Sequence, residues 1–171
     1  MSQIPTRISL RRIGFIVLIV LLDQGTKHLV VGSLQPSRPM VILPSVEFVL
    51  SYNKGISFSF LRFARDAQRW PLVGLSMMAS GLLGWWLSRI RSGRPVLAIG
   101  LALIIGGALG NMLDRARIGS VIDFVQVFYK AWSFAVFNVA DAAITIGVIA
   151  ILASTYLETP DVSTDRQGKD G

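Results

Sequence analysis

The chain has 171 residues, 52% of them apolar, with 17 Lys and Arg against 10 Asp and Glu. This composition and the positive mean hydropathy favour a small integral membrane protein of one domain over a soluble globule. Because the chain has no Cys and a single His, His28, we exclude disulfides, a Cys nucleophile and metal sites built from thiolates or several imidazoles, and we expect no cofactor. The basic residues flank apolar runs, so we expect anionic lipid headgroups as their partners and no nucleic acid.

The first predicted membrane span covers residues 13–31. It must include Asp23 and Lys27, because the unbroken apolar run before them is too short to cross a bilayer. These two residues stand at i and i+4 in the favourable acid-first order, so we expect them to pair on one helix face. A cleaved signal peptide is the alternative, but no small-residue cleavage site follows the apolar run.

A long link at residues 32–70 follows the first span. Residues 41–52 within it are rich in β-branched and aromatic side chains with partial alternation, which predicts a short strand.

Two further spans are predicted at residues 72–87 and 96–113, joined by a short link that carries three arginines. A second dense group of arginines precedes the first span, and such clusters mark the cytoplasmic side of a membrane. We therefore expect both termini in the cytoplasm and the links 32–70 and 114–137 outside.

Small and polar residues follow one another near the end of the third span. Gly106 and Gly110 have the Gly-x-x-x-Gly spacing that lets helices pack closely. Asn111, Asp114 and Arg115 stand at i, i+3 and i+4, so they share one helix face. They form either an interfacial ion pair with an amide or part of a functional site.

The link 114–137 contains a second strand-like pattern at residues 121–129. Together with residues 41–52, it predicts a small sheet resting on the outer membrane surface. The predicted fold is therefore an α-helical membrane protein with four transmembrane helices and a small β-sheet region and loop on the outer membrane surface.

The fourth span is predicted at residues 139–157, which closes a single integral membrane domain at residues 1–157. Residues 158–171, with Pro and mixed charges, predict a disordered cytoplasmic tail.

Two aspartates flank this last turn of the chain, and both are expected near the outer membrane surface. Asp123 precedes the fourth span by a short distance, and Asp141 lies in its first turn. Asn138 and Asp141 have the spacing of a capping box, a purely structural role. If the two carboxylates meet, the like charge raises the pKa of Asp123 and gives one protonated and one ionised carboxyl group, as in aspartic proteases.

Five motifs of the chain occur in the order and spacing found in lipoprotein signal peptidase, also called signal peptidase II, which the chain resembles over all but its two tails. They are Asp23-Gln-Gly-Thr-Lys27, Asn53-Lys-Gly55-Ile-Ser-Phe58-Ser, Gly110-Asn-Met-Leu-Asp-Arg115, Val121-Ile-Asp123-Phe and Phe137-Asn-Val-Ala-Asp141. Lys54 stands where that family usually has Thr, and Ile56-Ser57 where it usually has small apolar residues.

The resemblance implies an aspartic endopeptidase with Asp123 and Asp141 as the catalytic dyad. It implies that further residues line or support the site: Asn53, Gly55, Asn111, Arg115, Asn138, Asp23 and Lys27. Asp114 is expected beside them, at the outer end of the third helix. It also implies a substrate, a prolipoprotein with diacylglyceryl on its lipobox Cys, which is cleaved just before that Cys.

The expected location is the bacterial inner membrane, with the site near the outer face of a multi-pass monomer that globomycin inhibits. The loop from Asn53 to Phe58 is the expected closing element, because Gly55 gives it backbone freedom. Two other classes remain open on the residues alone: a small proton-coupled carrier that uses the aspartates as a relay, and a non-catalytic membrane subunit.

Overall fold

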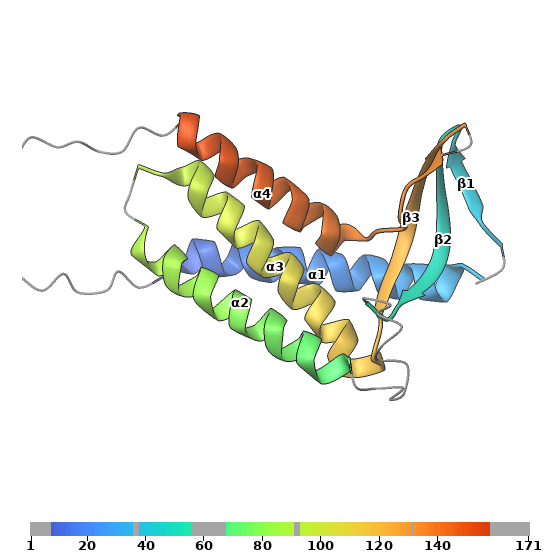
Figure 1. The fold of residues 1–171 in the computed structure, drawn as a ribbon, viewed down its shortest axis with the longest axis horizontal. Coiled ribbons are helices and arrows are strands. Elements are labelled where there is room, and N and C mark those ends of the chain that lie inside the picture. The colour runs from blue at the N-terminus through green and yellow to red at the C-terminus, as the bar shows by residue number, and fades with distance from the viewer. Residues whose placement is uncertain (1–7, 36–37, 56–67, 91–92, 131, 158–171) are drawn as a thin grey trace, which may run out of the picture.

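The computed structural model describes residues 8–35, 38–55, 68–90, 93–130 and 132–157, which form four helices and one four-stranded sheet (Figure 1). In chain order the elements are α1 (Leu10–Ser33), β1 (Met40–Leu43), β2 (Val46–Asn53), α2 (Arg69–Arg89), α3 (Pro95–Ile118), β3 (Val121–Tyr129), β4 (Trp132–Ser133) and α4 (Val139–Leu157). The sheet stands at one end of the helical bundle, which we call the sheet end. The predicted tail at residues 158–171 lies outside the described residues.

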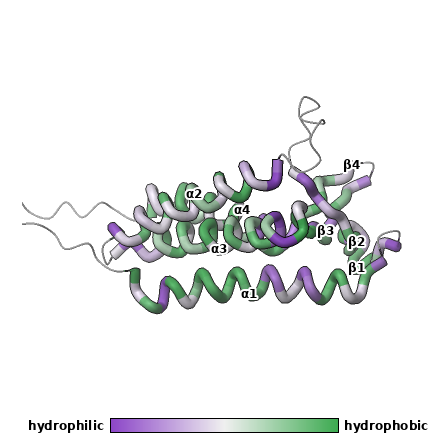
Figure 2. Tube along the Cα trace, turned by 90° about the horizontal axis from the view of Figure 1, so that it is seen from below, coloured by the Kyte–Doolittle hydropathy of each residue, from purple (hydrophilic) through white to green (hydrophobic). Residues whose placement is uncertain are grey.

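All four helices are long and apolar enough to cross a membrane, which confirms the four predicted spans. Figure 2 shows that their sequences are mainly hydrophobic, with hydrophilic residues in the half of α1 nearer the sheet. One boundary was wrong: the link was expected to begin at Asp114, yet α3 continues to Ile118. The helix ends there because Gly119 adopts the left-handed conformation (φ 78°) and caps it.

Helix α3 lies at the centre of the bundle and packs against α1, α2 and α4. Gly106 and Gly110 face α1, where an added Cβ would meet the side chains of Ile19 and Asp23. The predicted role of this Gly-x-x-x-Gly spacing as a packing surface is therefore confirmed.

A second pair of glycines brings α3 against the backbone of α4. A Cβ on Gly100 would lie 2.8 Å from the carbonyl oxygen of Gly147, and a Cβ on Gly107 would collide with the carbonyl oxygen of Ala140. Gly107 therefore sets how closely the first turn of α4 approaches α3.

The sheet is antiparallel in the order β1-β2-β3-β4. β1, β2 and β3 occupy the two predicted strand segments, whereas the two-residue β4 is too short to give a sequence signal. Phe137 forms an isolated bridge with Val125 of β3, so the chain enters α4 directly beside that strand. On the side toward the helices, Phe124 packs edge-on against Phe48 and contacts Val30 and Leu34.

Candidate active site

The two aspartates come from different elements and meet at the sheet end of the bundle. Asp123 lies on β3 and is 2% exposed, while Asp141 lies in the first turn of α4 and is half-buried. Because Phe137 pairs with β3, the next residue, Asn138, contacts both aspartates. The two carboxylates are close enough to interact electrostatically.

Asp123 accepts a hydrogen bond on each carboxylate oxygen. Asn53 Nδ2 donates to Oδ2 at 3.0 Å, and Asn138 Nδ2 donates to Oδ1 at 2.6 Å. Burial raises the pKa of Asp123 above its ordinary value, and the negative charge of Asp141 raises it further, whereas these amide donors lower it. The predicted direction is confirmed, although desolvation rather than like charge is the larger cause.

Asp141 takes part in the predicted capping box. Its backbone N–H donates to Asn138 Oδ1 at 3.0 Å, and its Oδ2 accepts from the backbone N–H of Asn138 at 3.3 Å. Its other oxygen, Oδ1, accepts from Asn111 Nδ2 at 2.8 Å. The capping role and a place in the site therefore coexist in the same side chain.

A buried charged cluster lies next to the dyad. The Lys27 ammonium group contacts Asp23 Oδ2 at 2.9 Å, Asp114 Oδ2 at 2.7 Å and Asn111 Oδ1 at 3.0 Å, and all four residues are at most 6% exposed. The predicted pairing of Asp23 with Lys27 is confirmed. Asp114 pairs with Lys27 rather than with its neighbour Arg115, because Asp114 turns toward α1.

Sequence reasoning missed three groups that complete this cluster. Gln24 Nε2 donates to Asp114 Oδ1 at 2.9 Å, the backbone N–H of Ala140 donates to Asp23 Oδ1 at 3.0 Å, and that of Ile122 donates to Asp114 Oδ2 at 3.2 Å. Gln24 lies within the motif Asp23-Gln-Gly-Thr-Lys27 and could have been predicted from it. The two backbone donors have no signal in residue type.

Arg115 lies in the last turns of α3 and interacts electrostatically with Asp141, Asp123 and Asp114. Its Nε is buried and has no hydrogen-bond partner among the described residues. The described part of the structure therefore leaves this donor of Arg115 unused.

Asn53 and Gly55 lie at the edge of the site where β2 ends. The backbone N–H of Gly55 donates to Asn53 Oδ1 at 2.9 Å, which turns the amide so that its Nδ2 faces Asp123. Gly55 has a φ of 92°, and an added Cβ would lie 2.9 Å from Leu72 Cδ1, so this turn requires glycine. Ile56, Ser57 and the rest of the predicted closing loop lie outside the described residues.

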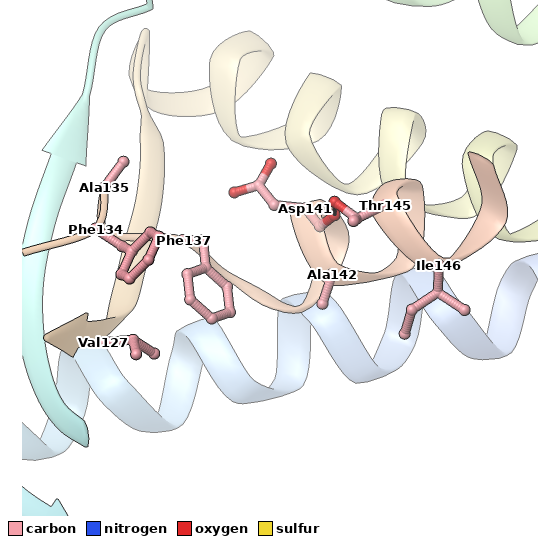
Figure 3. Close-up of a pocket in the computed structure, with 8 residues that line it drawn as sticks. All are labelled: Val127, Phe134, Ala135, Phe137, Asp141, Ala142, Thr145 and Ile146. Carbon is pink, nitrogen blue, oxygen red and sulfur yellow. Dashed lines mark hydrogen bonds between the residues drawn. The ribbon is translucent and has the colours of Figure 1, made fainter. Parts of the chain in front are cut away.

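A cavity adjoins each aspartate of the dyad, and Ala135 lines both cavities. The larger, about 580 Å³, is mainly apolar and runs from Asp141 along the first turns of α4 (Figure 3). It is lined by Val127, Phe134, Ala135, Phe137, Asp141, Ala142, Thr145 and Ile146. The other, about 430 Å³, is more polar and lies beside Asp123 and the turn at Asn53 and Gly55.

The structure thus brings all ten predicted site residues to the sheet end. One hydrogen-bonded group contains five of them: Asn53, Asn111, Asp123, Asn138 and Asp141. The buried charged cluster contacts this group through Asn111. Among the described residues, no group of His, Asp and Glu is arranged to hold a metal ion. A pair of coupled carboxylates in a partly dry pocket is suited to acid–base hydrolysis.

Comparison with known proteins gives concordant matches. Residues 15–157 match the family model for signal peptidase (SPase) II. The chain is 38% identical over 156 residues to the lipoprotein signal peptidase of Pseudoalteromonas translucida, with 91% of this chain and 94% of that protein covered. It is 41% identical over 144 residues to that of Acinetobacter baumannii, with 84% and 82% covered.

Two solved structures share the fold. Both are described as bacterial membrane enzymes, determined by the in meso method at 2.3 and 1.9 Å resolution. They superpose with TM-scores of 0.73 and 0.75 at 22% sequence identity, covering 99% and 92% of this chain and all of each neighbour.

Proposed function

This chain belongs to the signal peptidase II family, and we propose that it is an aspartic endopeptidase that removes signal peptides from prolipoproteins. The observation that carries the proposal is that one residue, Asn138, donates to both carboxylates at the border of two cavities, from its side-chain amide to Asp123 and from its backbone N–H to Asp141. A structural cap alone accounts for Asp141 but not for a second buried carboxylate beside it.

In the proposed reaction, the ionised carboxylate takes a proton from water as the water attacks the scissile carbonyl carbon. The protonated carboxyl group donates its proton to the carbonyl oxygen, which gives a tetrahedral diol. A hydroxyl of the diol then gives a proton to the carboxylate just formed, while the other carboxyl group protonates the leaving amine as the C–N bond breaks. Each step leaves the dyad with one proton, so it returns to its starting state after hydrolysis. Four side chains orient the substrate backbone relative to the two carboxylates: Asn53, Asn111, Arg115 and Asn138.

The two cavities support a membrane-anchored substrate. The apolar cavity at Asp141 can hold an acyl chain or the apolar side of a signal peptide, whereas the polar cavity at Asp123 suits the peptide backbone. We propose cleavage just before a Cys that carries diacylglyceryl. The lipid anchor fixes the depth of the scissile bond, so recognition comes from positioning more than from hydrophobic gain.

We place the enzyme in the bacterial inner membrane, as a multi-pass monomer with the sheet end at the outer face. The support is the distribution of basic residues: Arg11, Arg12, Arg89 and Arg94 all lie at the opposite end of the bundle. A reporter fused within residues 56–67 should therefore report the exterior.

The test is cleavage of a diacylated precursor by purified protein. We expect Asp123→Asn and Asp141→Asn each to lower the rate by about 10²–10⁴-fold, because the amide keeps the shape but cannot exchange the proton. Glu47→Gln, the same change on the neighbouring strand, is the matched control and should cleave normally.

Two results would contradict the proposal in different ways. Substantial turnover by either Asp→Asn variant would refute the aspartic mechanism. Equal rates on diacylated and unmodified precursor would refute the lipoprotein assignment and leave the mechanism intact.

A further inference from the structure

The proton of the dyad can be assigned from the buried cluster, provided that the proposed aspartic mechanism holds. A lysine ammonium group has three N–H donors and no acceptor. Lys27 directs them to three different oxygens, Asp23 Oδ2, Asp114 Oδ2 and Asn111 Oδ1, at 2.7–3.0 Å. All of its donors are therefore in use, and every atom that faces it must be an acceptor.

This contact fixes the orientation of the Asn111 amide. Since Lys27 can only donate, the atom of Asn111 that faces it must be the oxygen. Asn138 Nδ2 donates to the same oxygen at 3.1 Å and favours the same orientation. The amide nitrogen of Asn111 then points to Asp141 Oδ1, at 2.8 Å, so Asp141 must accept there.

Asp141 has three further features that favour a carboxylate. Its Oδ2 accepts from the backbone N–H of Asn138, and it lies in the first turn of α4, where the helix dipole favours negative charge. Arg115 interacts electrostatically with Asp141, as it does with Asp123 and Asp114.

Asp123 also accepts two amide hydrogen bonds, so hydrogen-bond number alone does not separate the two carboxylates. It differs in burial and in the source of its donors. Asp123 is 2% exposed on a strand, without a helix dipole, and one of its donors belongs to Asn53, an exposed residue at the end of β2. Burial without a paired cation favours the neutral form.

We propose that Lys27 is a positioning residue of the dyad: through Asn111 it holds Asp141 as the ionised carboxylate that accepts a proton from water, and it leaves Asp123 as the carboxyl group that donates. Asp141 interacts electrostatically with Asp123 from β3 and with Arg115 from α3. Lys27, with Asp23 and Asp114, is linked to it by Asn111. Lys27 is paired with Asp23 and Asp114, and it reaches Asp141 through the Asn111 amide.

The first test compares two matched substitutions in pH profiles of kcat/KM. Asn111→Leu removes the donor to Asp141, and Asn53→Leu removes the donor to Asp123, and neither change adds a charge beside the dyad. A hydrogen bond to a charged group corresponds to about one to two pH units. We expect Asn111→Leu to move the acid limb to higher pH by that amount and to leave the alkaline limb in place. We expect Asn53→Leu to move the alkaline limb to higher pH and to leave the acid limb in place. The reverse pattern, or equal movement of both limbs, overturns the assignment.

The second test addresses Lys27 itself. Arginine also has only donors, so Lys27→Arg should keep the acid limb in place, whereas Lys27→Gln, which can offer an acceptor, should move it to higher pH. Acid limbs that coincide in the two variants overturn the positioning role. Thermal unfolding of both proteins in detergent identifies a variant that has lost its fold.

A third measurement needs no activity and decides the assignment if a variant does not fold. Infrared spectroscopy at neutral pH should detect the band of a protonated carboxyl group in wild type and in Asp141→Asn, but not in Asp123→Asn. Loss of the band in Asp141→Asn alone overturns the inference. Full activity of both Asp→Asn variants would instead refute the proposed function, so the two failures are distinguishable.

Discussion

Gly107→Ala should lower both stability and activity, because Gly107 sets the position of the helix turn that carries Asp141. An added Cβ would collide with the Ala140 carbonyl oxygen and would lie 2.8 Å from Ile144 Cγ1. The carbonyl is backbone and cannot rotate away, so the first turn of α4 must move. That turn also holds the Ala140 N–H that donates to Asp23.

The expected change in the free energy of unfolding is the difference between two opposing effects. Overpacking of a close contact costs about 1–3 kcal/mol, and a rigid backbone contact belongs at the upper end. Alanine regains about 1 kcal/mol of helix propensity over glycine. We therefore expect a net loss of about 2 kcal/mol in the free energy of unfolding. A shift of the reacting groups by about 1 Å lowers the rate by about 10²-fold.

The assay is thermal unfolding in detergent together with cleavage of a diacylated precursor. Gly81→Ala is the matched control, since Gly81 lies on the exposed face of α2 with no atom within 4 Å of an added Cβ. It should be as active as wild type and no less stable. If Gly107→Ala unfolds and cleaves like Gly81→Ala, the close approach of α3 and α4 does not position the dyad.

Three further predictions concern charge, the turn at Gly55, and inhibitors. Because the pKa of Asp123 is raised in the folded protein, the unfolded chain loses this proton at a lower pH, so Asp123 lowers the free energy of unfolding as the pH rises above about 4. Asp123→Asn should therefore unfold at a higher temperature than wild type at pH 7. A temperature difference that is the same at pH 3 would contradict this. Gly55→Ala should lower the free energy of unfolding by about 1–3 kcal/mol, because φ is 92° at this turn and Leu72 is close. It should also raise KM, and an unchanged KM would show that the turn does not contact the substrate. Globomycin should block cleavage and chelators should not, and inhibition by EDTA that added metal reverses would refute the metal-free mechanism.

The spans and strands could be predicted because their signals are local. An apolar run of membrane length and an alternation of β-branched residues are both readable without knowledge of the partner segments. The pairing of Asp23 with Lys27 and the capping box of Asn138 with Asp141 also lie within one helix turn. Spacing alone was sufficient for these contacts.

The remainder of the site depends on contacts between distant segments. That Lys27 binds Asp114 from α3, and that the Ala140 N–H reaches Asp23, follows from how closely three helices approach one another. Gly100 and Gly107 allow that approach to α4, yet their spacing of seven did not suggest it. The end of α3 was misplaced because Asp114 and Arg115 looked like interfacial residues, although they lie inside the helix and face protein groups.

The cluster around Lys27 also bears on how the chain enters the membrane. Asp23 and Lys27 are one turn apart in α1, so we expect the first span to enter the bilayer with its two charges already paired. Asp114 joins them when α3 arrives, and the N–H of Ala140 is added last, with α4. Asp114 and the Ala140 N–H thus each meet a partner that was synthesised before them, and the site is complete only when α4 has joined the bundle. We expect a chain that stops before α4 to be inserted but unable to cleave, because it lacks Asp141.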